Sequence, residues 1–197
     1  VVELGNVMAH HTGGFGFSGN YKNFDFSANF TYQIGGKVYN ASAMCEYTGG
    51  KEPGIGKNKR DFIRDCFQLY DVRNGELVVV TDPTELAALN RNATRPVPYY
   101  EANTVLSDFI EDASFLRLSN LTIGYSFPKT LLKKAYIQSA RVYVTGGNLF
   151  CITGYSGLDP EVSTNGAAGN SGYPTPGLDY GSYPRSRTFT VGLNLTF

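Results

Sequence analysis

The chain has 197 residues, with equal numbers of basic and acidic side chains (17 each), and this neutral balance gives no support for a nucleic-acid binder or a polybasic membrane-surface protein. No apolar run approaches the roughly 20 residues that a membrane helix requires, which excludes a helical membrane protein. Only 17% of the residues are charged, whereas Gly (23), Tyr (14) and Phe (13) are abundant, a composition that favours strands and turns.

The first predicted strand covers about 14–22. Gly14, Gly16 and Gly19 match the spacing G-x-G-x-x-G of a dinucleotide-binding loop. That motif needs a strand before it and a helix after it, whereas a strand pattern follows here. We therefore interpret these glycines as a flexible strand entry, and Lys22-Asn23 as a tight hairpin turn.

The second predicted strand covers about 23–46 and begins with the clearest alternation in the chain. From Phe24 to Ile34 every second residue is apolar or aromatic, and the residues between them are polar. This period of two predicts a strand with one apolar and one polar face, paired antiparallel with the first strand.

The alternation stops in residues 48–113, which hold many of the charged residues and four prolines. So long a connection is usually functional or structured in its own right. Inside it we expect a short helix over 61–70, a strand over 76–81 and a helical turn over 83–89. We treat the whole segment as one large exposed loop.

Three further strands are predicted over about 114–127, 139–152 and 186–197. A short connection joins the first two of them, and a second long loop, 153–185, precedes the last. The sequence Gly146 to Phe150 indicates a bend within the fourth strand. The last strand has apolar residues at every second position and no charge after Arg187: Phe189, Val191, Leu193, Leu195 and Phe197.

Short and long connections alternate along the chain, and in bacterial outer-membrane barrels short turns face the periplasm and long loops face outside. The prediction is an all-β fold of about five antiparallel strands, fewer than the roughly eight of the smallest such barrels. An open sheet in lipid leaves unpaired backbone groups at both edges. We therefore expect the C-terminal segment of a larger transmembrane β-barrel with long extracellular loops.

Several motifs occur in order over 113–197: ASFLRLSNLTIGY, PKTLLKK, RVYVTGGNLF, GYSGLDPE and DYGSYPRSR. Together they resemble the C-terminal portion of SusC/RagA-type TonB-dependent transporters. The resemblance implies a large barrel with an N-terminal plug in the outer membrane of a Gram-negative bacterium. It implies import of oligosaccharides or peptides, energised by the TonB complex, beneath a SusD-like surface lipoprotein. The plug is absent from this chain, so the implied partners include the rest of the barrel, the plug and outer-membrane lipid.

Four tyrosines in the last long loop are candidates for contact with a substrate or a lid, because aromatic faces suit both. They are Tyr155, Tyr173, Tyr180 and Tyr183. The alternative is that these rings pack within the loop. The terminal strand, with Phe189, Val191, Leu193, Leu195 and Phe197, resembles the signal by which barrel-assembly machinery recognises its clients.

No residue pattern predicts catalysis, a cofactor or a metal site. Asp159 and Glu161 lack the further oxygen ligands of a calcium loop, so we interpret them as loop-structuring. His10-His11 has no partner cluster, and Cys45 and Cys66 are candidates for a disulfide only in an oxidising compartment. Two alternatives remain open, a soluble all-β carbohydrate-binding module and a small adhesin-type outer-membrane barrel.

Overall fold

The computed structural model describes residues 3–48, 61–97, 106–133, 136–162 and 176–197. The chain divides into two compact units, which are considered separately below. The first consists of Val1–Asn40 together with Ile110–Phe197, and the second of Ala41–Phe109.

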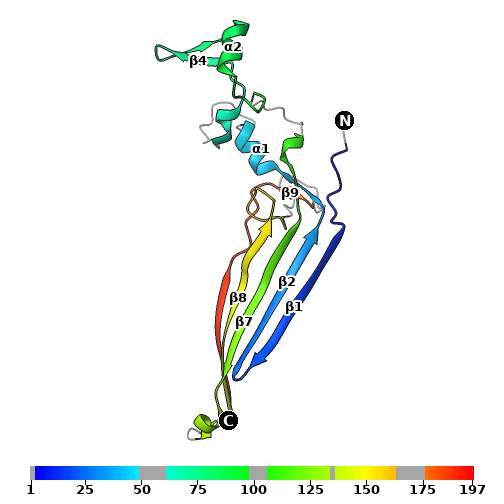
Figure 1. Cartoon of the computed structure of the whole chain (residues 1–197), viewed down its shortest axis with the longest axis vertical. Helices are drawn as coiled ribbons and strands as arrows, with labels where there is room; N and C mark the ends of the chain where they lie inside the picture. The colour runs from blue at the N-terminus through cyan, green and yellow to red at the C-terminus, as the bar shows by residue number, and fades with distance from the viewer. Residues whose placement is uncertain (1–2, 49–60, 98–105, 134–135, 163–175) are drawn as a thin grey trace, which may run out of the picture. The chain divides into compact units, whose positions relative to one another are not determined.

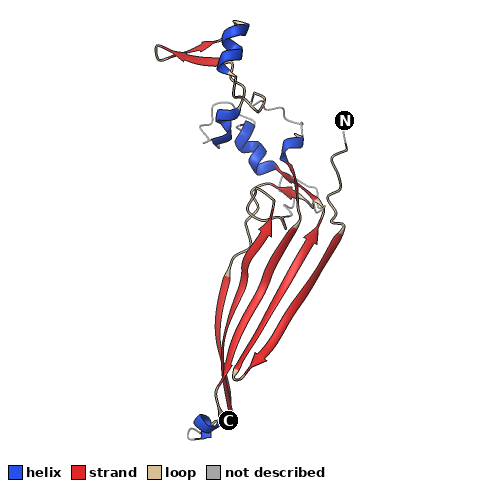
Figure 2. Ribbon diagram, in the orientation of Figure 1, coloured by secondary structure: helices blue, strands red, loops and turns tan. Residues whose placement is uncertain are grey.

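A five-stranded sheet dominates the first unit (Figures 1 and 2). Its order is β1-β2-β7-β8-β10, and all neighbours pair antiparallel. The strands are β1 (His11–Tyr21), β2 (Phe24–Ile34), β7 (Phe115–Ser126), β8 (Ser139–Thr153) and β10 (Thr188–Thr196). The predicted all-β class and large antiparallel sheet are confirmed.

Short connections lie together at one end of this sheet. Lys22 and Asn23 link β1 to β2, and Lys22 takes a positive φ of 54°, as two-residue hairpins require. The helical turn α3 (Lys129–Leu132) follows β7 and precedes β8, and its last residue, Leu132, is buried.

A β-bulge at Ser119 changes which side chains of β7 share a face. Below the bulge Leu121 pairs with Ala28 of β2, whereas above it Leu118 pairs with Phe30. The register with β8 shifts at the same height, where Asn148 has a φ of 53°, so the bend expected near 146–150 is confirmed. Because one extra residue reverses the alternation, Arg117 is opposite Thr31 on the polar face.

Aromatic rings cover glycines on the neighbouring strand. A side chain at Gly13 would overlap the ring of its partner Tyr32, and one at Gly19 would overlap the ring of Phe26. The glycines predicted to mark a strand entry, Gly14, Gly16 and Gly19, therefore lie within β1, and of these Gly19 makes room for a ring. Covering strand glycines with cross-strand aromatic rings stabilises pairing that glycine alone weakens.

The single strand expected over 23–46 is broken after Ile34 and gives way to a helix from Ala41. Gly35 and Gly36, with φ of 79° and 87°, end β2 and turn the chain out of the large sheet. It resumes as β3 (Lys37–Asn40), which pairs antiparallel with β6 (Ile110–Asp112) and parallel with β9 (Leu178–Asp179). Residues Ala41–Thr48 then form the helix α1.

The second unit is more ordered than a single large loop. It contains α1, the 3₁₀ turns Asp61–Asp65 and Ser107–Phe109, strands β4 (Tyr70–Arg73) and β5 (Glu76–Val79), and helix α2 (Pro83–Leu89). Asn74-Gly75, both with positive φ, close the β4–β5 hairpin. Asp82 caps α2 by accepting hydrogen bonds from the amides of Thr84 and Glu85.

Buried apolar residues of the first unit lie mainly outside the middle of the sheet. One cluster combines Val38 of β3, Ala113, and Tyr155 and Val162 of the last loop. The sheet thus has no hydrophobic core of its own over most of its length. Among the helices that the structure describes, none is both long enough and apolar enough to cross a bilayer.

Candidate functional site

One face of the sheet is apolar and exposed. Paired residues form apolar rows across all five strands, such as Tyr21, Phe24, Tyr125, Val142 and Leu193. Of these, Tyr21 is 69% exposed and Leu193 60%, and Phe189 and Val191 on the same face of β10 are each 73% exposed. A continuous apolar surface of this kind is rare on a soluble monomer and marks contact with another apolar phase.

The opposite face is mainly polar, with Phe115 and Tyr143 as aromatic exceptions. A row of hydroxyl side chains crosses all five strands: Ser18, Ser27, Thr122, Thr145 and Thr190. Within it Thr122 and Thr145 share a hydrogen bond of 2.8 Å. A sheet with one apolar and one polar face, both exposed, has the arrangement of a barrel wall between lipid and water.

An ion pair spans three strands on this polar face. Arg141 of β8 donates to the carboxylate of Asp25 on β2, passing over β7, which lies between them. Gly124 of β7 lies directly below, and a Cβ there would overlap both charged groups. The pair in this geometry therefore occupies the space that a Cβ at this position would fill.

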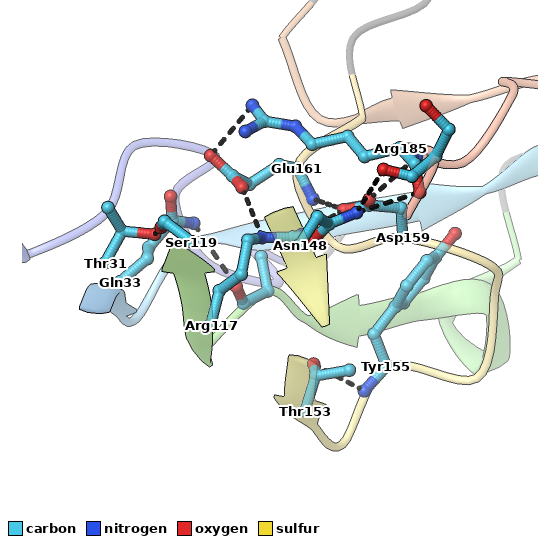
Figure 3. A network of polar contacts seen from close by, with 12 residues as sticks. Thr31, Gln33, Arg117, Ser119, Asn148, Thr153, Tyr155, Asp159, Glu161 and Arg185 are labelled. Atoms are coloured by element: carbon cyan, nitrogen blue, oxygen red, sulfur yellow. Dashed lines mark hydrogen bonds and ion pairs between the residues drawn. The ribbon is translucent and has the colours of Figure 1, made fainter. Parts of the chain in front are cut away.

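A second polar network is centred on Arg117, whose side chain is 3% exposed (Figure 3). Its guanidinium donates to Asn148 Oδ1 at 2.6 Å and to Asp159 Oδ1 at 2.6 Å, and its Nε lies 2.9 Å from Glu161 Oε2. Arg185 pairs with the other oxygen of Glu161 at 3.2 Å, and its amide donates to Asp159. Both ends of the last loop are thus fixed to β7, and Asp159 and Glu161 are loop-structuring, as interpreted from the sequence.

Sequence reasoning missed Arg117. Simple alternation with Leu121 and Ile123 assigns it to the apolar face, and its partners Asn148, Asp159 and Glu161 are distant in the chain. The one available signal was an arginine that breaks an otherwise uncharged apolar pattern.

The last loop is also held by Tyr155 and Asp179. Tyr155 is 5% exposed, and its hydroxyl donates to Asp179 Oδ2 at 2.6 Å. A second group joins Glu111 of β6 to Asn40 and Ser156 through hydrogen bonds of 2.6 to 3.2 Å. These contacts tie the loop to the small sheet β6-β3-β9.

The four candidate tyrosines lie in different environments. Buried Tyr155 has the position of a loop-packing residue, the alternative considered from sequence. Tyr180 and Tyr183 are 61% and 93% exposed, so their role in substrate or lid contact stays a prediction. Tyr173 lies outside the described residues.

A cleft of about 400 Å³ opens where the polar face meets the last loop. The paired residues Thr12 and Gln33 form part of its wall on the sheet, and Lys37, Glu161 and Arg185 contribute charges. Its volume is within the range of small-molecule sites.

The described residues contain no group of three or more His, Cys, Asp or Glu side chains placed to hold a metal ion. No disulfide joins Cys45 to Cys66, both of which the structure describes. Near the small sheet, hydrogen bonds from the Ser114 hydroxyl and amide, with Lys37 close by, hold the pKa of Asp112 below its ordinary value.

Together these features define the class of protein: a section of a β-barrel wall whose polar side carries a loop fixed by buried ion pairs. The chain is 33% identical to TonB-dependent receptor P3 of Formosa agariphila over 194 residues, covering 98% of this chain and 17% of that receptor. It is 43% identical to TonB-dependent receptor SusC of Bacteroides thetaiotaomicron over 90 residues, covering 45% and 8% of the two chains. Among solved structures, the RagAB peptide importer in the 'closed-closed' state matches 97% of this chain and 18% of its own, with a TM-score of 0.69 and 26% identity.

This chain is homologous to SusC-type TonB-dependent receptors and matches part of their barrel. It spans less than a fifth of the length of the curated relatives it matches. No protein-family model matches it. The relatives are receptors and importers rather than enzymes, which agrees with the expected absence of catalysis.

Proposed function

We propose that this chain is a section of the barrel wall of an outer-membrane receptor that imports nutrients with energy from the TonB complex. The observation that carries the proposal is the pair of exposed faces, one apolar and one polar, on a single antiparallel sheet. In this assignment the apolar face contacts outer-membrane lipid and the polar face lines the lumen. A soluble carbohydrate-binding module is not favoured, because it would leave the apolar face in water.

The two outer edges of the sheet support a further part of the proposal, which concerns the partners within the receptor. Among the described residues β1 and β10 each pair on one side only, so the remaining strands of the barrel supply their outer neighbours. The plug occupies the lumen, and the loops about 48–113 and 153–185 face the cell exterior beneath a SusD-like lipoprotein. The exposed alternation that ends at Phe197 serves as the assembly signal.

The relatives suggest two substrate classes. SusC and the RagAB peptide importer support uptake of oligosaccharides or peptides by this receptor. Exposed Tyr180 and Tyr183 remain candidates for contact with the substrate or the lipoprotein.

Fractionation and uptake test the proposal. An antibody against Ser186–Phe197 is expected to detect a band several times heavier than 21.5 kDa in the outer-membrane fraction. Deleting the gene is expected to abolish growth on a peptide or oligosaccharide that wild-type cells use, and loss of TonB should give the same defect. A soluble product, or a defect that does not depend on TonB, would contradict it.

A further inference from the structure

The end of the large sheet that carries the short connections has an unbalanced charge (Figure 1). No acidic residue lies between Asp112 and Asp159, although the whole chain has equal numbers of acidic and basic residues. Three described lysines are exposed at this end, Lys22 in the β1–β2 turn and Lys129 and Lys133 at the two ends of α3. The inference below rests on the proposed function, in which the short turns face the periplasm.

These lysines have no acidic partner among the residues that the structure describes. None of them belongs to an ion pair there. Asp25, the acidic residue next along the chain from Lys22, is already paired with Arg141. The side chains at this end therefore leave a net positive charge, which suits an anionic partner.

A band of aromatic rings lies beside these lysines on the apolar face. The ring centroids of Phe24 and Tyr125 are 4.8 Å apart, and those of Tyr125 and Phe127 are 5.3 Å apart. Tyr21, on the same face, is 69% exposed, and the Nζ of Lys22 lies 5.4 Å from its ring centroid. The ammonium of Lys22 is thus beside a ring of the apolar face, and aromatic bands of this kind mark the boundary between lipid and water.

The turn after β7 also combines apolar and basic side chains at its surface. Leu131 is 64% exposed and Tyr136 is 92% exposed. Lys129 lines a cleft of about 390 Å³ whose lining residues, all of them described, include no acidic side chain. In the headgroup region of a bilayer, such apolar side chains contact acyl chains while lysine ammonium groups reach the phosphates.

We propose that this end of the sheet binds an anionic phospholipid, such as phosphatidylglycerol, in preference to zwitterionic phosphatidylethanolamine. The lysine ammonium groups contact the phosphate, and the acyl chains lie along the apolar face beside Tyr21 and Phe24. Phosphatidylethanolamine brings its own ammonium group, so it offers no net charge to the lysines. The partner is a lipid surface rather than an acidic protein, because the charges lie beside exposed rings of the face assigned to lipid.

Native mass spectrometry of the complete receptor in detergent tests the proposal, with the two phospholipids added in forms that have the same acyl chains. Phosphatidylglycerol is expected to bind more tightly, and its advantage should decrease as salt is added, because salt screens exposed charges. Inorganic phosphate at the same ionic strength should not displace the lipid, since it has no acyl chains. Equal affinity for the two lipids would overturn the proposal, as would displacement by phosphate, which would indicate a site for a free anion.

A matched pair of variants locates the lipid. Replacing the three lysines of this end with glutamine should lower the affinity for phosphatidylglycerol by about fivefold for each lysine, and leave that for phosphatidylethanolamine unchanged. The control removes the same formal charge from side chains that already have acidic partners: Lys37→Gln, Arg64→Gln and Arg73→Gln. It should keep the preference. A preference that the lysine variant retains, or that the control loses to the same extent, would refute the assignment to this end.

The lipid preference and the proposed function can fail separately. Lipid binding is measured on the purified receptor, whereas membrane fractionation and TonB dependence concern transport. A receptor that is located in the outer membrane and depends on TonB, but has no preference for the anionic lipid, would refute the lipid proposal alone.

Discussion

Replacing Arg117 with methionine is expected to release the last loop while leaving the sheet folded. Methionine keeps much of the volume but removes the donors to Asn148 and Asp159 and the ion pair with Glu161. Asp159, 5% exposed, then keeps the amides of Glu161 and Arg185 as its partners among the described residues. Removing one partner of a buried ion pair costs about 3–5 kcal/mol, and we expect the lower end because Arg185 still neutralises Glu161.

Hydrogen exchange measured by mass spectrometry on the complete receptor provides the assay. A loss of about 3 kcal/mol in the free energy of local opening corresponds to exchange more than about 100-fold faster in peptides covering 156–162 and 183–187. The control is Arg64→Met, since Arg64 and its partner Asp61 have side chains 82% and 96% exposed, and such pairs contribute about 0–1 kcal/mol. The triple variant Arg117→Met, Asp159→Asn, Glu161→Gln should recover part of the protection, because it removes the stranded charges. Exchange within about twofold of wild type in Arg117→Met would refute this account of the loop.

Four further predictions follow from other parts of the chain. Gly124→Ala should break the Asp25–Arg141 ion pair, so its thermal destabilisation should match that of Arg141→Met and the double variant should lose nothing more; additive losses would contradict the geometry. Val191→Lys on the apolar face should cost about 2–4 kcal/mol in folding titrations into lipid, whereas Thr190→Lys on the polar face should stay within about 0.5 kcal/mol; equal costs would reverse the facial assignment. The lowered pKa of Asp112 means that its ionised form stabilises the small sheet at neutral pH and that this contribution is lost as the pH falls through the folded-state pKa. Asp112→Asn should therefore reduce protection of β3 at pH 7, and the reduction should shrink progressively as the pH is lowered below the ordinary carboxylate range; an effect that does not change with pH would exclude the ionic contribution. Deleting Phe197 should lower the amount of folded barrel in the outer membrane without changing the substrate affinity of the folded fraction, and unchanged barrel levels would argue against an assembly signal.

The large sheet could be predicted because its evidence is local. Alternation of period two, as in Phe24 to Ile34 and Phe189 to Phe197, depends only on neighbours in sequence and on the two environments of the sheet. The tight turn at Lys22-Asn23 and the long connections then ordered the strands. The predicted strand ends were less accurate, because the sequence analysis did not identify Gly35-Gly36 as the point where the chain leaves the large sheet after β2.

The site was harder to predict because its contacts are not local. Arg117 meets Asp159 over 42 residues, and Tyr155 meets Asp179 over 24. A bulge at Ser119, which no composition signal marks, decides the face on which Arg117 lies. The role of Tyr155 likewise depends on whether the folded loop buries it, which residue type alone does not specify.

The ion pair over Gly124 also has a consequence for comparing relatives of this protein. Asp25 and Arg141 are separated by a whole strand, so the two charges and the intervening glycine form a unit of three positions that we expect to change together. A relative with any larger residue at the position of Gly124 should lack one or both charges, and a relative with both charges should keep the glycine. Correlated substitution among positions 25, 124 and 141 in an alignment would thus indicate that β2, β7 and β8 are neighbours in relatives whose structures are unknown.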